Sequence, residues 1–199
     1  MSTTETLHAD IAACRVCETA LGFAPRPVVQ FSSTSRILII GQAPGSKVHA
    51  SGIPWDDASG DRLREWTGLN RDQMYDAQQV ALVPMGFCYP GKANGGDRPP
   101  RPECAPLWHE RVLAALPDDR LTLLVGSYAQ AAHLPETRGW TMARRVEHWL
   151  ETDGAAFDGA IPLPHPAWRS TLFMRKHPWF EADLLPRLRA RIARRLGQA

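Results

Sequence analysis

The sequence predicts an α/β fold in which a parallel sheet is covered by helices on both faces. Short apolar runs rich in Val, Ile and Leu recur along the chain, and helical patterns separate them. The runs are apolar at successive positions, as in strands buried on both faces. Alternation of such strands with helices is typical of parallel sheets. The 199 residues fit one domain, or at most two very small ones, and we expect a single domain over residues 1–199.

Four apolar runs are expected to form the strands of this sheet. They are residues 36–40, 80–83, 121–125 and 160–163. The first run stops at Gly41 and the last leads into Pro164. Because ligands of such sheets bind at the carboxyl ends of the strands, the loops that follow these runs are the places to look for a site.

The helices expected around the strands carry apolar residues at helical spacing. They cover residues 5–13, 61–66, 106–116, 128–133, 141–150 and, as a basic C-terminal helix, 181–196. We expect Ser127 to cap the fourth helix and Gly197 to end the last one. Residues 41–59 and 86–102 are rich in turn formers and are expected to be loops, the second long enough to be either functional or disordered.

Composition and charge exclude several classes of protein. With 44% hydrophobic and 22% charged residues, the bulk of the chain is not disordered. No apolar run approaches the roughly 20 residues that span a bilayer, and residues 1–10 lack the pattern of a secretory signal. We therefore expect a soluble, cytoplasmic protein without membrane association.

The net charge of +2 is unevenly distributed along the chain. From Arg169 onward, eight Lys and Arg stand against two acidic residues, which gives this end +6 and leaves −4 for the rest. A basic end suggests a polyanionic partner such as nucleic acid. A solvated helix face is the alternative reading.

The four cysteines are the candidate metal ligands. Cys14 and Cys17 form a C-x2-C pair in the N-terminal segment, and Cys88 and Cys104 stand at either end of the Gly- and Pro-rich loop. Disulfides are rare in a reducing compartment, so we expect the four thiols to converge on one site. Such a site suits an iron–sulfur cluster or a structural zinc ion, and the spacing does not choose between them. Ordinary buried thiols are the alternative.

The loop after the first strand begins with Gly41-Gln42-Ala43-Pro44-Gly45. Two Gly and one Pro fix a tight turn whose backbone N–H groups can face an anion or a carbonyl oxygen. The spacing matches neither a dinucleotide-binding fingerprint nor a P-loop. Further along, Trp55 stands beside Asp56 and Asp57, and its ring is suited to stack on a base. A partly buried core Trp is the alternative.

The loop after the last strand places His165 between Pro164 and Pro166. The prolines fix the backbone on both sides, and a rigidly held His is suited to act as a general acid or hydrogen-bond donor. A structural or surface His is the alternative. An aromatic and basic cluster suited to phosphates and unstacked bases follows, formed by Trp168, Arg169, Arg175 and Lys176.

Together these motifs resemble the uracil-DNA glycosylase superfamily, and most closely its family-4 branch, which contains an iron–sulfur cluster. The order and spacing of the cysteines are similar to those of that branch. Its Gly-Glu-Ala-Pro-Gly motif corresponds to residues 41–45, its Gly-x-Pro-Phe to residues 52–55, and its His-Pro to residues 165–166. The resemblance covers the chain from Cys14 to at least Trp168.

The resemblance implies a three-layer α/β/α fold around a four-stranded parallel sheet. It also implies hydrolysis of the N-glycosidic bond of uracil, or another deaminated base, flipped out of DNA. His165 would donate a hydrogen bond to the leaving base, and Trp55 would stack on it. The turn formed by Gln42, Ala43, Pro44 and Gly45 would hold the base edge and the attacking water.

The resemblance further implies a monomer that acts on DNA, single- or double-stranded. Arg169, Arg175 and Lys176 would contact phosphates, with Trp168 beside them. A structural 4Fe–4S cluster, with zinc as the alternative, would be held by Cys14, Cys17, Cys88 and Cys104.

The chain departs from the family pattern in ways that affect its chemistry. Gln42 replaces the family's Glu, and an amide can position water but cannot take its proton; Asp56 or Asp57 is the candidate to compensate. The acidic residues that follow the first motif in the family are replaced by residues 47–49, Lys-Val-His. The second strand ends in Val-Pro-Met-Gly at residues 83–86, without the Asn by which the family reads uracil.

These departures leave more than one function open. The chain is either a glycosylase for uracil or another deaminated base, or a superfamily relative that binds nucleic acid or nucleotides without base release. A more remote reading is a zinc-stabilised α/β protein whose ligand is unrelated to DNA.

Overall fold

The computed structural model describes residues 3–93 and 95–198, and its central feature is a four-stranded, all-parallel sheet. The strand order is β2-β1-β5-β6. The strands are β1 (Ile37–Ile40), β2 (Val80–Leu82), β5 (Leu121–Val125) and β6 (Ile161–Leu163). In the register, Ile37 pairs with Val80 on one side and with Leu121 on the other. All four strands lie within the predicted runs.

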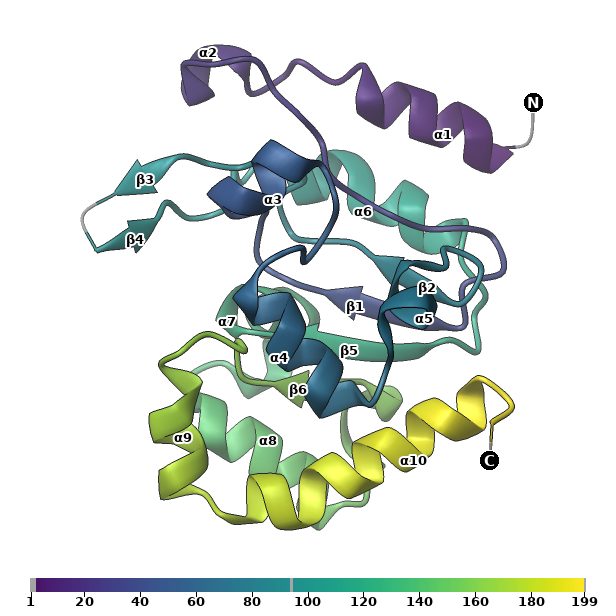
Figure 1. The fold of residues 1–199 in the computed structure, drawn as a ribbon, viewed down its shortest axis with the longest axis vertical. Coiled ribbons are helices and arrows are strands. Elements are labelled where there is room, and N and C mark those ends of the chain that lie inside the picture. The colour runs from purple at the N-terminus through teal and green to yellow at the C-terminus, as the bar shows by residue number, and fades with distance from the viewer. Residues whose placement is uncertain (1–2, 94, 199) are drawn as a thin grey trace.

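Helices cover both faces of this sheet, as predicted. On one face lie α1 (Thr3–Ala12), α6 (Cys104–Ala114) and α7 (Ser127–His133); on the other lie α4 (Ala58–Thr67), α8 (Met142–Glu151) and α10 (Leu185–Arg195). In Figure 1, α1 and α6 lie on one side of the strands, and α8 and α10 on the other. The result is the expected α/β/α arrangement.

Each strand contributes to two separate cores, which explains its continuous apolar run. Successive side chains of a strand point to opposite faces of the sheet. Ile37 and Ile39 of β1 accordingly pack with α4, α8 and α10, whereas Leu38 and Ile40 pack with α1, α6 and α7. A polar residue at any of these positions would face one of the cores.

Regular structure also occurs where loops were expected. Residues 41–59 contain α3 (Ser46–Ser51), and residues 86–102 contain a small antiparallel hairpin of β3 (Lys92–Ala93) and β4 (Gly96–Asp97). Three further helices were not predicted from the sequence: α2 (Glu18–Leu21), α5 (Arg71–Tyr75) and α9 (Ser170–Lys176). Short 3-10 turns occur at Pro135–Thr137 and Ala156–Gly159.

The helix predicted over residues 181–196 consists of two parts. A π-helical turn, Phe180–Leu184, precedes α10. Pro186 stands in the first turn of α10, where its missing N–H costs nothing, and it interrupts the helical hydrogen bonds before that point. Gly197 ends the helix as predicted: its φ is 71°, and the amide of Gln198 donates to the carbonyl of Ala193 at 2.8 Å.

The prediction that Ser127 caps α7 is wrong. The helix begins at Ser127, and the residue before it, Gly126, is the N-cap without a side-chain hydrogen bond. Gly126 has φ 88° and ψ 171°, a conformation open essentially to glycine alone. This conformation turns the chain from β5 into the helix one residue earlier than a serine cap would.

The basic C-terminal helix is bound to the body of the protein by its arginines. Arg195 pairs with Asp119 at 2.7 Å, and Arg187 pairs with Asp153 at 3.3 Å. Arg189 donates to the carbonyl of Glu65 at 2.8 Å. Much of the +6 charge of this end therefore fastens α10 rather than forming an unpaired basic surface. No helix among residues 3–93 and 95–198 has the length and hydropathy to cross a membrane.

Candidate active site

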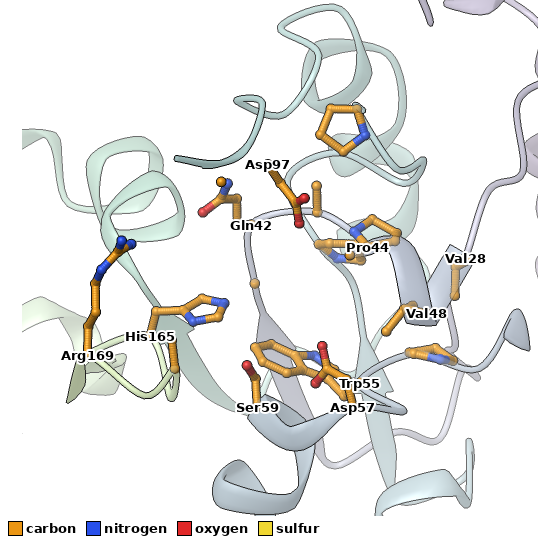
Figure 2. Close-up of a pocket in the computed structure, with 18 of the residues that line it drawn as sticks. Val28, Gln42, Pro44, Val48, Trp55, Asp57, Ser59, Asp97, His165 and Arg169 are labelled. Atoms are coloured by element: carbon orange, nitrogen blue, oxygen red, sulfur yellow. The ribbon is translucent and has the colours of Figure 1, made fainter. Parts of the chain in front are cut away.

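A cavity of about 570 Å³ lies at the carboxyl ends of the strands, and loops from several parts of the chain line it (Figure 2). The predicted residues among its lining are Gln42, Ala43, Pro44, Gly45, Trp55, Asp57, His165 and Arg169. Ser59, Pro84, Ala167 and Asp97 are lining residues that sequence reasoning did not select. The structure thus brings the two predicted motif loops together in one pocket.

Trp55 forms a fixed wall of this pocket. Its φ of 57° is a genuine outlier for a bulky residue, and such strain persists only where the surroundings enforce it. The enforcing contacts are close: a Cβ at Gly41 would lie 2.7 Å from the indole ring, and the hydroxyl of Tyr75 donates to the Trp55 carbonyl at 3.3 Å. Figure 2 shows the ring lying across the pocket with Asp57 and His165 beside it.

His165 follows β6 and points toward the space between Trp55 and Gln42 (Figure 2). Its ring centroid lies 5.7 Å from that of Trp55, with an angle of 31° between the planes. Burial lowers the pKa of His165, and the carboxylate of Asp57 opposes this only in part. The imidazole is therefore neutral near pH 7, with one N–H to donate and one nitrogen that accepts.

Two polar side chains hold the His165 loop in place. Arg62 of α4 donates to the carbonyl of Ala167 at 2.9 Å and to the hydroxyl of Ser170 at 3.1 Å. The buried amide of Gln130 donates to the carbonyl of Leu163 at 2.9 Å, directly before the loop. Neither residue carried a signal in the sequence, because Arg and Gln in a helical pattern ordinarily face solvent.

The two adjacent aspartates have different positions. Asp57 lines the pocket and caps α4, its Oδ1 accepting from the Gly60 amide at 2.9 Å. Asp56 pairs with Arg71 at 3.2 Å and is not part of the pocket lining. Of the two compensating candidates, Asp57 is therefore the one with access to a bound molecule.

The end of β2 presents Pro84 to the pocket. Proline has neither an N–H nor a polar side chain. Its carbonyl lies 2.9 Å from Nε2 of the buried His109. This edge of the pocket therefore lacks an amide at Pro84 with which to read a base.

The predicted DNA-binding residues lie at the rim and beyond it. Trp168 is 75% exposed, and the guanidinium of Arg169 lies 5.0 Å from its ring. Arg169 reaches the pocket lining, whereas Arg175 and Lys176 are exposed in the last turn of α9 and outside that lining. An aromatic ring this exposed beside a pocket is available to a partner.

The four cysteines line a second, much smaller pocket. All four are free thiols, and the Phe87 amide donates to the sulfur of Cys104 at 3.2 Å. Burial, and then the neighbouring thiols, raise the pKa of Cys88 to about 12. Burial raises the pKa of Cys104 to about 11, although the Phe87 amide opposes this.

The donor set at this second pocket suits a soft metal. Four thiols from α6, from the segment after α1 and from the loop after β2 are the ligand type of iron–sulfur and zinc sites. Within the part of the chain that the structure describes, no three His, Cys, Asp or Glu side chains are grouped as a site for a metal ion.

Comparison with known families agrees with this architecture. The model of the Uracil DNA glycosylase superfamily matches residues 28–189. The match includes all four strands of the sheet and every residue of the large pocket, while Cys14 and Cys17 precede it. The chain belongs to the uracil DNA glycosylase superfamily.

Proposed function

We propose that this protein is a DNA glycosylase that hydrolyses the N-glycosidic bond of uracil or another deaminated base. One observation carries the proposal. This chain belongs to the superfamily, and its His165, Trp55 and Gln42 line one pocket of about 570 Å³ although they come from separate parts of the chain. A flipped base needs a cavity of this kind, with an aromatic face and convergent polar groups.

In this proposal the flipped base stacks on Trp55, whose fixed position supports it from one side. The neutral imidazole of His165 donates its N–H to an acceptor atom of the base. As the glycosidic bond breaks, its electron pair moves to the base, and this hydrogen bond stabilises the developing negative charge. The sugar becomes oxocarbenium-like and is captured by water. Loss of one such preorganised donor typically costs about 3–4 kcal/mol of barrier.

Gln42 and Asp57 are proposed to act on the water and on the charges around it. The amide of Gln42 can hold a water molecule through both its carbonyl and its NH₂ group. The charge of the Asp57 carboxylate opposes the lowering of the pKa of His165, so the two groups lie within reach of each other's charge. A negative charge at that position stabilises the positive charge that develops on the sugar.

We propose that Trp168, Arg169, Arg175 and Lys176 contact the DNA around the pocket. The exposed ring of Trp168 offers a stacking surface for an unpaired base, and the cations offer partners for phosphates. Because Arg169 also lines the pocket, it is placed to hold the phosphate next to the flipped nucleotide.

We also propose that the four cysteines hold a structural 4Fe–4S cluster, as in the family-4 branch, with zinc as the alternative. All four donors are thiols, and the Phe87 amide already donates to one of the sulfurs, a contact typical of iron–sulfur ligation. In a 4Fe–4S cluster each thiolate binds a separate iron, so the sulfurs stand farther apart than the ligands of a single ion. When bound, the group would tie residues 14–17 to the start of α6.

A second candidate function is nucleic-acid binding without base release. Two observations favour it: the amide at Gln42 cannot accept a proton from water, and Pro84 provides no amide to read uracil. The pocket and its rim would then serve recognition alone.

A base-release assay separates the two functions. Oligonucleotides that contain uracil, hypoxanthine or xanthine, single- and double-stranded, are incubated with the wild type, with His165→Ala and with His148→Ala, a control on α8 outside the pocket lining. Free base from the wild type and the control but not from His165→Ala supports the proposal. Salt-sensitive DNA binding without release of any base selects the second function.

A further inference from the structure

The pocket contains a carboxylate that did not stand out in the sequence, that of Asp97. It belongs to β4 of the hairpin, and in Figure 2 it points into the pocket near Gln42 and Pro44. Its Oδ2 lies 3.5 Å from the position of a Cβ at Gly45, and Oδ2 of Asp57 lies 3.8 Å from the same position. Both carboxylates therefore lie beside Gly45 in the pocket lining.

Hydrolysis in this pocket is accelerated by a group that accepts a proton from the attacking water. Among the described residues of the lining, the carboxylates are those of Asp57 and Asp97. Gln42 is an amide and cannot accept the proton, and His165 is occupied as the donor to the leaving base.

Asp57 is the less suitable of the two carboxylates for this step. Its Oδ1 accepts from the Gly60 amide as the cap of α4, which fixes the side chain. Its charge also acts on His165. Protonation of Asp57 would weaken both interactions and would remove the negative charge that stabilises the oxocarbenium-like sugar.

Asp97 has a different environment. It caps no helix, its side chain is exposed, and its carboxylate lies close enough to the hydroxyl of Tyr89 to raise the pKa of that group. Burial, followed by the charge of Asp97, raises the pKa of Tyr89, so Tyr89 remains a hydroxyl beside the carboxylate. The Asp97 oxygen that lies near Gly45 in the pocket lining is Oδ2.

We propose that Asp97 is a catalytic residue that accepts the proton of the attacking water, an inference that rests on the proposed glycosylase function. The bond from C1′ of the sugar to the base nitrogen breaks, and the water oxygen then forms a bond to the oxocarbenium-like C1′. The water proton moves to Asp97, and the electron pair of the broken bond leaves with the base. The base, held by His165, then takes up a proton from solvent, and Asp97 releases its proton to solvent, which restores the carboxylate.

The test uses chemical rescue in the full-length protein. On the deaminated base that the wild type releases fastest, Asp97→Ala should lower the single-turnover rate by about 100-fold or more. Its affinity for the same DNA should stay within about threefold of the wild type. Added formate should fill the space of the lost carboxylate and raise the single-turnover rate of Asp97→Ala at least about tenfold. Asp56→Ala removes a neighbouring carboxylate outside the pocket lining and should change neither quantity.

The outcomes distinguish this inference from the function on which it rests. If the wild type releases base and Asp97→Ala is equally fast, or slow but insensitive to formate, the role of Asp97 is refuted while the glycosylase proposal stands. If the wild type releases no base from any substrate, the glycosylase proposal fails and the role of Asp97 fails with it.

Discussion

Replacement of Gly60 by alanine is expected to destabilise the protein and to displace Trp55. Gly60 lies inside α4, and its amide is the donor to Asp57. A Cβ at this position would lie 1.7 Å from the carbonyl oxygen of Trp55 and 2.7 Å from its carbonyl carbon. Because both are backbone atoms, the clash cannot be relieved by rotation of a flexible side chain.

Two opposing effects determine the size of the change. Helix propensity alone would favour alanine over glycine by at most about 1 kcal/mol. Relief of the clash requires a backbone shift of more than about 1 Å, and overpacking of this kind typically costs about 1–3 kcal/mol, occasionally more. We expect a net loss of about 2 kcal/mol, which for a domain of this size lowers Tm by about 4–8 °C.

Thermal unfolding followed by circular dichroism measures this loss. Gly96→Ala is the control, because no atom of residues 3–93 or 95–198 lies within 4 Å of a Cβ there, and its Tm should change little. On a cleaved substrate, Gly60→Ala should also be slower by about 100-fold, since a displacement near 1 Å has that effect on catalysis. A Tm equal to or above that of the wild type would refute the proposed packing of α4 on Trp55.

Three further predictions concern DNA binding, pH and the metal site. Trp168→Ala should weaken DNA binding by about 1–3 kcal/mol and leave Tm unchanged, because the ring is 75% exposed. An affinity for DNA equal to that of the wild type, measured by fluorescence anisotropy, would contradict this. Burial lowers the pKa values of His109, His133 and His165, so the unfolded chain binds more protons than the native one. The free energy of unfolding should therefore have its full value above pH about 6.5 and fall as the pH is lowered. Denaturant titrations in which it does not fall between pH 7 and pH 5 would contradict the burial of these histidines in the neutral form. Wild-type protein purified without oxygen should contain iron and absorb near about 400 nm, whereas Cys88→Ser should lose both; a colourless wild type that contains zinc would contradict the cluster.

The sheet was predictable because the apolar pattern of each strand is contained in a short segment of the sequence. A strand buried on both faces must be apolar at every position, and Ile37–Ile40 has that property. The loops that follow such strands meet at one edge, so the sequence also indicated that residues 41–45 and His165 would lie together. The pocket places them as expected, while the chemical roles assigned to them stay predictions.

The remaining features depend on contacts between distant segments. Asp97 enters the pocket through a short hairpin in which each strand has two residues, and no periodicity reveals so short an element. Arg62 reaches the His165 loop across more than one hundred positions in the chain. The left-handed backbone of Trp55 is imposed by its neighbours against the preference of the residue itself.

The most direct test of the glycosylase function is a single-turnover time course of base release by the wild type and by His165→Ala. The substrate is the fastest-cleaved oligonucleotide, at protein concentrations that saturate it, so that the rate reports the chemical step alone. The proposal predicts free base and an abasic strand from the wild type, and a rate lower by roughly 100-fold or more in His165→Ala, equivalent to the loss of about 3–4 kcal/mol of transition-state stabilisation. Equal rates for the two proteins, or no base released by the wild type while it remains bound to DNA, would contradict it.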